Sequence, residues 1–302
     1  MSSSPFRWLV APLAFLAGFA AIAADAPKPL LWRIEGPIPS YIFGTIHLSS
    51  PDVTKLASPT EKAVQSADVL LTEVSMDMVD QLKAVTALMG MESLSDVLPK
   101  DLYERSEAEV QRINPALNLK PFEKMKIWGL AMTIAMLEEQ LKNPGGMPLD
   151  MVLFMKAKDA GKEVGGIETF EEQTGVFDAF SKEEQIAMLR ATLDDMDRAR
   201  KEGKSPLDEL RTAYLSGDLQ VLDRTMNEWM TGLDQKLLAR FMDSLLTRRN
   251  HIMADRISAK LKATPEKSFF FAVGAGHLPG EEGILKLLEK QGLKLTRATE
   301  AP

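Results

Sequence analysis

The stretch SFFFAVGAGH, residues 268–277, decides the fold of this chain. Its apolar residues from Phe269 to Val273 follow one another without a polar break, and the segment ends in Gly274-Ala275-Gly276-His277. A continuous apolar run of this length is typical of a β-strand buried on both faces, as in a sheet covered by helices. The glycines allow the backbone to turn sharply where the strand ends.

Other strand-like segments and helical patterns alternate with this one. Strands are predicted at residues 41–47, 69–74, 162–168 and 293–297. Short helices are predicted at 59–66 and 281–291, and long helical stretches at about 77–160 and 169–263, with helices at 122–142, 148–160 and 235–261. This order predicts an α/β fold, in which a small, mostly parallel sheet is surrounded by helices and carries long helical insertions.

The N-terminus has the pattern of a secretory signal peptide. A short segment with one positive charge precedes an apolar run from Trp8 to Ala23, which ends in the small-residue site Ala21-Ile22-Ala23. We expect residues 1–23 to be removed and residues 24–302 to form a single domain, in the periplasm or outside the cell. The alternative is an uncleaved N-terminal anchor, but the run is short for a membrane span of roughly 20 residues and contains proline.

A second apolar run, from Ile127 to Leu137, lies inside a helical pattern. It is also shorter than the roughly 20 residues that a span needs, so we interpret it as a buried core helix. No stable membrane span is therefore expected after the signal peptide is cleaved.

The composition restricts the chemistry of the 302-residue chain. Acidic residues outnumber basic ones 43 to 36, which argues against a nucleic-acid partner. The absence of cysteine excludes disulfides, thiolate metal sites and cysteine nucleophiles. Histidine-dependent chemistry has three candidates, His47, His251 and His277. No feature of the sequence indicates a particular oligomeric state.

Two histidines and two glutamates follow predicted strands. His47 and His277 each end a Gly-x-x-His turn, and Glu73 and Glu168 close the strands near 70 and 165. Ligand sites in open α/β sheets lie at the carboxyl ends of the strands, so these four side chains are candidates for one shared site. Two imidazoles and two carboxylates would suit a divalent metal such as Mn, Co, Fe or Zn. Such a metal could activate water, with an unbound carboxylate as general base. The alternative is that these polar groups only cap strand ends or form salt bridges.

The segment Arg248-Arg249-Asn250-His251 lies inside a helical pattern. Arg249 or Asn250 could face a carboxylate or a developing oxyanion. His251 is interpreted as a surface or supporting residue of the helix. Just after Glu168, Thr169 and Glu172 have the spacing of a capping box that starts a helix.

The ordered set of these motifs resembles the TraB/GumN family from about residue 30 to 298. The resemblance rests on residues 31–34, 41–47, 70–74, 165–169 with Glu172-Gln173, Arg249-Asn250, and 273–280. The family is grouped with the Tiki metalloproteases and with ChaN and erythromycin-esterase-like folds. The resemblance implies an α/β core with helical insertions and a site at His47, Glu73, Glu168, Arg249, Asn250 and His277. Tiki-like members imply metal-dependent peptide cleavage, and TraB-like members are linked to limiting peptide pheromone signals.

Motifs and resemblance together predict an exported, metal-dependent hydrolase. It would cleave a peptide or related amide bond by a metal-activated water, with a metal held by His47, His277 and one or both of Glu73 and Glu168. One alternative is a non-catalytic binder of a peptide, a metal or a tetrapyrrole in the same cleft. Another is the hydrolysis of a non-peptide ester, so the substrate is a peptide or a small molecule.

Overall fold

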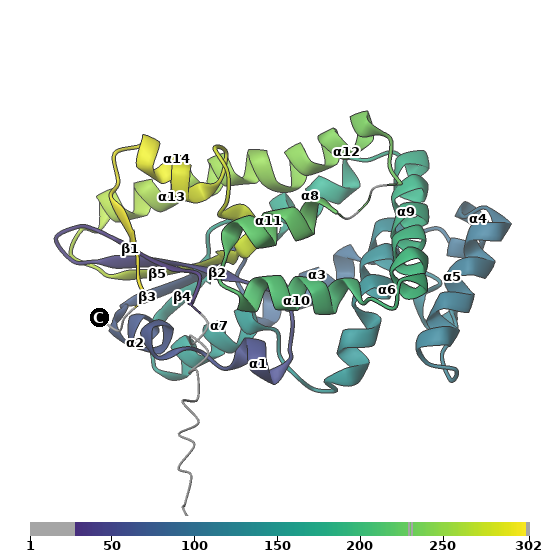
Figure 1. The fold of residues 1–302 in the computed structure, drawn as a ribbon, viewed down its shortest axis with the longest axis horizontal. Helices are drawn as coiled ribbons and strands as arrows, with labels where there is room; N and C mark the ends of the chain where they lie inside the picture. Colours follow the sequence, from purple (N-terminus) through teal and green to yellow (C-terminus); the bar gives the residue numbers. More distant parts are fainter. Residues whose placement is uncertain (1–27, 229, 231, 300–302) are drawn as a thin grey trace, which may run out of the picture.

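The computed structural model describes residues 28–228, 230 and 232–299, and these residues fold around one six-stranded sheet of order β4–β3–β5–β2–β1–β6 (Figure 1). The predicted signal peptide, residues 1–23, lies outside the described residues. Neighbours from β4 to β2 are parallel, whereas β1 pairs antiparallel with both β2 and β6. The strands are β1 Leu31–Ile34, β2 Ser40–Thr45, β3 Val69–Thr72, β4 Glu163–Gly166, β5 Phe269–Gly274 and β6 Leu295–Arg297.

The burial of the strands follows their place in the sheet. β2 and β3 are buried throughout, and β5 is buried except at its last residue, because all three have neighbours on both sides. β4 is more exposed because it lies at the edge of the sheet. The sequence pattern did not predict β1, whose four residues are too few to show a clear alternation.

Helices occupy the chain between the strands, as predicted, and the mixed α/β fold class is confirmed. Helices α1 Pro51–Thr54 and α2 Ser58–Ser66 separate β2 from β3, and α14 Ile284–Lys290 precedes β6. Between β3 and β4 lie α3 Met78–Ala87, α4 Leu94–Val97, α5 Lys100–Ile113, α6 Ile127–Lys142 and α7 Leu149–Asp159. Between β4 and β5 lie α8 Phe170–Asp178, α9 Lys182–Lys201, α10 Pro206–Leu215, α11 Leu219–Asn227, α12 Gln235–Met242 and α13 Arg248–Ala263.

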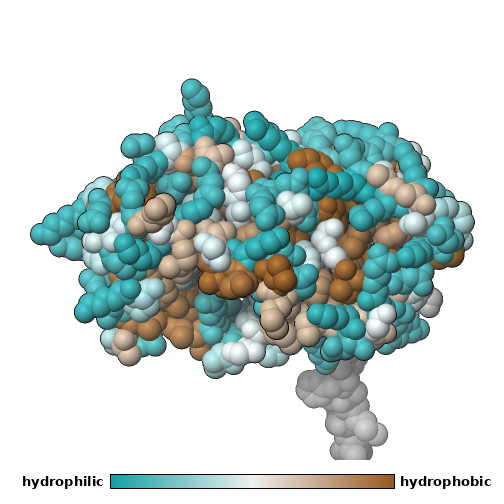
Figure 2. Space-filling model, turned by 180° about the vertical axis from the view of Figure 1, so that it is seen from behind, coloured by the Kyte–Doolittle hydropathy of each residue, from teal (hydrophilic) through white to brown (hydrophobic). Residues whose placement is uncertain are grey.

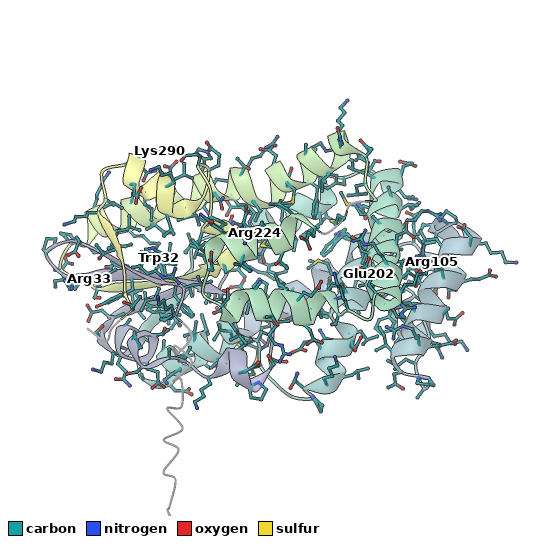
Figure 3. The ribbon with its side chains drawn as sticks, viewed as in Figure 1. Trp32, Arg33, Arg105, Glu202, Arg224 and Lys290 are labelled. Atoms are coloured by element: carbon teal, nitrogen blue, oxygen red, sulfur yellow. The ribbon has the colours of Figure 1, made fainter. Side chains whose placement is uncertain are left out.

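The described residues form three apolar clusters: one on the sheet, one among the helices at the far end, and a third that joins α9 to α12. Helices α13 and α14 cover one face of the sheet, and α2 and α7 cover the other (Figure 1). Helices α4, α5, α6 and α9 pack together at the far end around a second apolar cluster that includes Leu102, Leu130 and Leu189. The guanidinium of Arg105 of α5, labelled in Figure 3, donates hydrogen bonds to the side chains of Asp194 and Asp197 of α9, each at 2.6 Å.

Two predicted helices have different bounds. The helix expected at 122–142 begins only at Ile127, because the backbone at 124–126 pairs with residues 88–90 and is not available for helical hydrogen bonds. The helix expected at 235–261 is interrupted by a π-helical turn at Asp243–Thr247. Within α6, Ile127, Leu130 and Ile134 are buried, and no helix of the described part is long and apolar enough to cross a membrane.

Helix α3 contributes no buried residue to any of these cores. Its apolar side chains Met78, Val79, Leu82 and Val85 are 61–83% exposed. Figure 2 shows brown surface near the middle of the rear face, where α3 lies. Asp77 caps its N-terminus, and Lys83 forms an exposed ion pair with Glu171 of α8 at 3.4 Å.

Candidate active site

The four candidate side chains all follow the carboxyl ends of the parallel strands. His47 comes two residues after β2, Glu73 directly after β3, Glu168 two residues after β4, and His277 ends the 3₁₀ turn after β5. Parallel strands end at the same edge of a sheet, so this edge gathers the four residues. The two Gly-x-x-His turns also touch, since a Cβ on Gly44 would lie 3.1 Å from Cβ of Ala275.

Glu73 and Glu168 are joined by their backbone and by a buried arginine. The amide of Glu168 donates to the carbonyl of Glu73 at 2.7 Å. Arg249 Nη2 donates to Glu73 Oε2 at 2.6 Å and to Glu168 Oε2 at 2.7 Å, and Arg249 Nε donates to Glu168 Oε2 at 3.0 Å. All three side chains are at most 6% exposed. The guanidinium therefore compensates two buried carboxylates that would otherwise be costly to bury.

The π-helical turn before α13 positions Arg249. This turn ends at Thr247, and Arg249 Nη1 donates to the carbonyl of Leu245 within it at 3.2 Å. An extra residue in the turn rotates the following side chains relative to a regular helix. Arg249 and Asn250, which follow the turn, are both buried.

The side chain of Glu73 accepts hydrogen bonds from three different segments of the chain. Its Oε1 accepts from the amide of Gly274 at 2.5 Å, and its Oε2 also accepts from Gln173 Nε2 of α8 at 2.9 Å. Burial alone would raise the pKa of Glu73, but the charges of His277, Arg249 and His47 and the Gly274 amide lower it to about 2. Glu73 is therefore ionised at neutral pH. A Cβ at position 274 would lie 2.8 Å from Glu73 Oε1, so a larger residue there would displace this carboxylate.

The pKa of Glu168, in contrast, is raised. Burial raises the pKa of this carboxyl, and the hydrogen bonds from Arg249 only partly oppose that shift. Both of its oxygens face Arg249, at 3.0–3.3 Å from Nε. Arg249 therefore pairs with both carboxylate oxygens of Glu168.

His277 is buried and held in one orientation. Its Nδ1 lies 2.6 Å from Asn250 Oδ1, while Asn250 Nδ2 donates to the carbonyl of Glu282 at 2.8 Å. Because the amide nitrogen already faces a carbonyl, Oδ1 must accept, so Nδ1 of His277 carries the proton. The other nitrogen, Nε2, lies 3.5 Å from Glu73 Oε1. Burial lowers the pKa of His277 to about 4, against the opposing effect of Glu73, and the ring is neutral at pH 7.

His47 lies at the exposed rim of the site, with its side chain 61% exposed. Its Nδ1 lies 2.8 Å from Asp150 Oδ2, and Asp150 Oδ1 accepts from Thr45 Oγ1 at 2.5 Å. The Asp150 carboxylate raises the pKa of His47 to about 9. With Nδ1 bonded to Asp150, Nε2 is the nitrogen of His47 that is available to a ligand.

The sequence pattern missed Asp150 and Gln173. An aspartate in the first turn of a helix is ordinarily attributed to the helix dipole, and Asp150 occupies that place in α7. The one sequence feature that could have indicated burial of Asp150 is its place beside Leu149 in an apolar stripe. In the structure Asp150 is 1% exposed. Gln173 lies within the segment that resembles the family, but its bond to Glu73 depends on how α8 packs.

Asn250, which the sequence suggested could face a substrate or an oxyanion, instead bonds His277 and the carbonyl of Glu282. His251 is exposed on α13, and its Nε2 pairs with Glu282 Oε2 at 2.6 Å. The capping box is present, since Thr169 accepts from the Glu172 amide at 3.2 Å and Glu172 accepts from the Thr169 amide at 2.8 Å.

The donor chemistry of the site suits a divalent metal, although its donors are not gathered around one point. Both imidazoles have Nδ1 tied to an acceptor, as metal-binding histidines usually do, and His277 Nε2 lies beside an ionised carboxylate. Among residues 28–228, 230 and 232–299, however, no group of three or more histidine, aspartate or glutamate side chains is arranged to hold a metal ion. The residues are of the types that bind a divalent metal, but in this structure they do not surround a single point.

Comparison with known proteins gives a consistent set of relatives. The model of the TraB/PrgY/gumN family matches residues 30–297. Metalloprotease TIKI2 of Danio rerio and metalloprotease TIKI1 of Homo sapiens are each 26% identical, over 97% and 98% of this chain and 68% and 70% of their own. The uncharacterized protein YbaP of Shigella flexneri is 25% identical, over 82% of this chain and 87% of its own. No solved structure matches the chain.

Proposed function

The chain belongs to the TraB/PrgY/gumN family, and from this membership and the geometry of its site we propose that it is a metal-dependent hydrolase of peptide or related amide bonds. The observation that carries the proposal is the pairing of a neutral, oriented His277 with the ionised Glu73, with Nε2 and Oε1 3.5 Å apart. The metalloprotease names of the TIKI relatives support the same chemistry.

We propose that Nε2 of His277, Oε1 of Glu73 and Nε2 of His47 hold the ion, with His47 releasing its Nε2 proton when the ion binds. Glu73 Oε1 is the one oxygen of the two glutamates that Arg249 does not reach. A divalent ion such as Mn, Co, Fe or Zn would supply Lewis-acid activation of water and of the scissile carbonyl. Glu168 would have to exchange its bonds to Arg249 for such an ion, so we assign it to holding Arg249.

The chain's own residues then have distinct tasks. Arg249 keeps Glu73 ionised and in place, and Asn250 keeps Nε2 of His277 free of its proton. Both are positioning residues in this proposal, because their donors and acceptors already face protein groups. Glu73 supplies its Oε1 to the ion in this arrangement, while Glu168 holds Arg249.

Export of the protein is part of the proposal. The N-terminal pattern of residues 1–23 favours a periplasmic or secreted protein that begins near residue 24. N-terminal sequencing of the protein recovered from the periplasm or medium tests this directly. A recovered protein that begins at Met1 would contradict it.

A metal-loading experiment tests the catalytic proposal. The exported protein is stripped with a chelator, loaded separately with Mn, Co, Fe and Zn, and analysed for retained metal beside His277→Ala, with His251→Ala as control. We expect stoichiometric metal that is lost in His277→Ala and kept in His251→Ala. The loaded protein is then incubated with a peptide library, whose cleavage should stop when a chelator is added.

One alternative is favoured by the absence of a preformed cluster of three ligands in the described residues. A non-catalytic binder of a peptide, metal or tetrapyrrole would retain its ligand without turning over any peptide. Cleavage of small esters without peptide cleavage would favour an esterase instead. If no metal is retained by the unmodified protein, the metallohydrolase proposal is wrong.

A further inference from the structure

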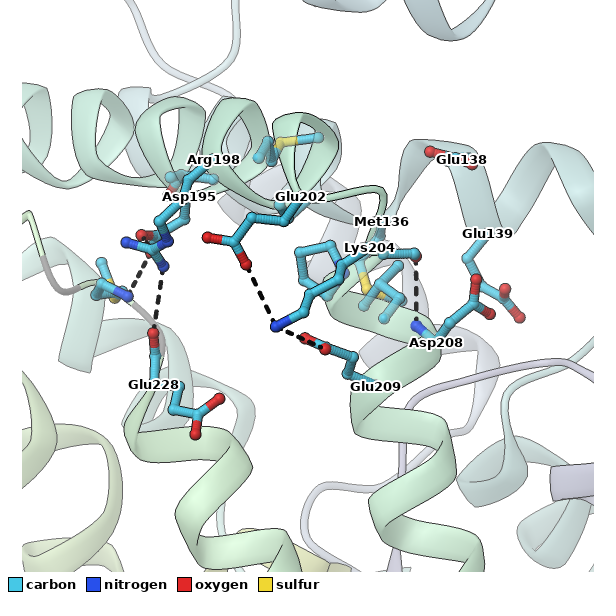
Figure 4. A pocket seen from close by; sticks show the side chains of 18 of the residues that line it. Met136, Glu138, Glu139, Asp195, Arg198, Glu202, Lys204, Asp208, Glu209 and Glu228 are labelled. Carbon is cyan, nitrogen blue, oxygen red and sulfur yellow. Dashed lines mark hydrogen bonds and ion pairs between the residues drawn. The ribbon is translucent and has the colours of Figure 1, made fainter.

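A cavity of about 420 Å³ lies apart from the candidate active site, between α6, α9, α10 and the end of α11 (Figure 4). None of His47, Glu73, Glu168 and His277 lines it. Its volume falls within the range of small-molecule binding sites, which is roughly 300–1,000 Å³. Nothing in the proposed hydrolysis uses this cavity.

Part of the lining is apolar. Met136 of α6, Met196 of α9 and Leu207 of α10 line the cavity from three sides. Methionine side chains are flexible and adapt to different apolar shapes. This part of the cavity can therefore receive a hydrocarbon chain or a ring.

The polar part of the lining carries an excess of negative charge. Seven carboxylate side chains line the cavity but only three cationic ones, namely Lys142, Arg198 and Lys204. Each of these cations is already paired with a carboxylate of the lining: Lys142 with Glu138 at 3.0 Å, for example, and Lys204 with Glu202 at 3.2 Å. Five of the seven carboxylates also form ion pairs, whereas no cation of the described residues pairs with Glu139 or Glu228. The formal charge of the lining therefore favours a cationic ligand over an anionic one.

Glu139 points to a ligand most directly. It lines the cavity, yet it is only 9% exposed. Its Oε1 accepts from Asn143 Nδ2 at 3.0 Å, and its Oε2 accepts no hydrogen bond from the described residues. This oxygen is not one of the buried polar atoms that lack a partner, so it is accessible from the cavity, where a positive group can pair with it.

We propose that this cavity binds an amphipathic organic cation, with an ammonium or guanidinium group at Glu139 and an apolar body against Met136, Met196 and Leu207. The cation could come from a free amine or from a basic side chain of a peptide. Either source presents the same charge and hydrocarbon to the cavity.

The α10–α11 segment connects this cavity to the candidate active site. Tyr214 of α10 donates to the carbonyl of Gly44 at 2.9 Å, in the first Gly-x-x-His turn. Met226 of α11 packs so closely on Gly276, in the second turn, that a Cβ there would lie 2.5 Å from its methyl group. Glu228, two residues after Met226, lines the cavity. The segment that lines one side of the cavity therefore also contacts both Gly-x-x-His turns.

Calorimetric binding of a matched pair of probes tests the proposal without any catalysis. The probes are 4-phenylbutylamine and 4-phenylbutyrate, which share the apolar body and differ in the sign of the charge. We expect the metal-free protein to bind the amine with a Kd about tenfold or more below that of the acid. Added salt should weaken the binding of the amine.

Variants locate the binding site. Glu139→Gln keeps the shape and the bond from Asn143, and it should raise the Kd of the amine by about tenfold. Ala135→Phe fills the cavity and should abolish binding. Glu104→Gln, an exposed carboxylate of α5 outside the cavity, is the matched control and should leave the Kd unchanged. Thermal unfolding confirms that each variant is folded.

Equal affinity for the amine and the acid, or amine binding that survives both Glu139→Gln and Ala135→Phe, would overturn the proposal. A second measurement, which rests on the proposed hydrolysis, identifies the source of the cation. Inhibition of peptide cleavage by 4-phenylbutylamine, lost in Glu139→Gln, indicates a subsite for a basic side chain. Binding without inhibition indicates a separate site for a free amine.

Discussion

Asn250 Oδ1 lies 2.6 Å from Nδ1 of His277, and this contact determines which nitrogen of the histidine can meet a ligand. The two residues come from different elements, α13 and the turn after β5. Because Asn250 also donates to the carbonyl of Glu282, its amide cannot turn over without losing a hydrogen bond. His277 therefore presents Nε2 toward Glu73.

Replacing Asn250 with alanine should weaken metal binding while the fold is kept. Without its acceptor, the imidazole of His277 can rotate and change tautomer, and loss of such a supporting contact typically costs about 10–100-fold in metal affinity. Competition with a chromogenic chelator measures the change. The control is His251→Ala, one residue further along α13 and exposed, for which the affinity should stay the same.

Arg249→Met should destabilise the protein strongly. It leaves the carboxylates of Glu73 and Glu168 buried without their cation, which costs about 3–5 kcal/mol in free energy of unfolding. Urea unfolding measures this loss. The loss should shrink in mild acid, because protonation of Glu168 removes one unpaired charge. A variant as stable as the parent would show that the guanidinium is not what compensates these carboxylates.

The metal-free protein should lose stability as the pH falls. The pKa of His277 is about 4 in the folded protein against 6.5 normally, so below pH 6.5 the unfolded chain takes up a proton that the folded one does not. Glu73, lowered from 4.5 to about 2, acts in the same direction at lower pH. Between pH 6.5 and pH 4 the pKa shift of His277 alone corresponds to a decrease on the order of 3 kcal/mol in the free energy of unfolding. Unfolding free energies of the parent and of His277→Gln across this range measure it, and parallel curves would refute the assignment.

Asp150→Asn should return the pKa of His47 from about 9 toward 6.5, because the carboxylate is the main cause of the rise. The imidazole signals of the metal-free protein can be followed by NMR, since the chain has only three histidines. Thr45→Val removes only the hydroxyl that donates to Asp150 and should leave His47 protonated at neutral pH. Because of the Asp150 contact, the pKa of His47 is higher in the folded protein than in the unfolded chain. The contact therefore stabilises the fold fully below pH 6.5, and this stabilisation is lost as the pH rises toward 9.

Gly274→Ala should displace Glu73 and reduce metal binding and turnover. The added Cβ would lie 2.8 Å from Glu73 Oε1, closer than real contacts allow. The matched control is Gly175→Ala in α8, where a Cβ meets nothing within 4 Å. That control should keep the metal and gain about 0.5–1 kcal/mol, because alanine loses less entropy in a helix than glycine. Normal metal binding by Gly274→Ala would show that the position of Glu73 does not matter.

The sequence alone determined the elements and the edge on which the site lies. Apolar runs at 41–47, 69–74 and 268–273 predicted buried strands, since side-chain pattern reports local conformation. Motifs that follow parallel strands lie at the same edge of the sheet. The sequence therefore places His47, Glu73, Glu168 and His277 at the carboxyl ends of the strands. Their roles as metal ligands remain predictions.

Only the tertiary structure decided what each of these side chains touches. Arg249 reaches Glu73 across 176 residues of sequence, and Asp150 reaches His47 across 103. Such pairings depend on how helices pack and on a single π-helical turn, and neither leaves a periodic signal in the sequence. Burial then set the charges, because it made His277 neutral while the Asp150 carboxylate kept His47 protonated. Local periodicity predicts an element and its place in the sheet, whereas the state of a buried polar group depends on the partners that packing brings to it.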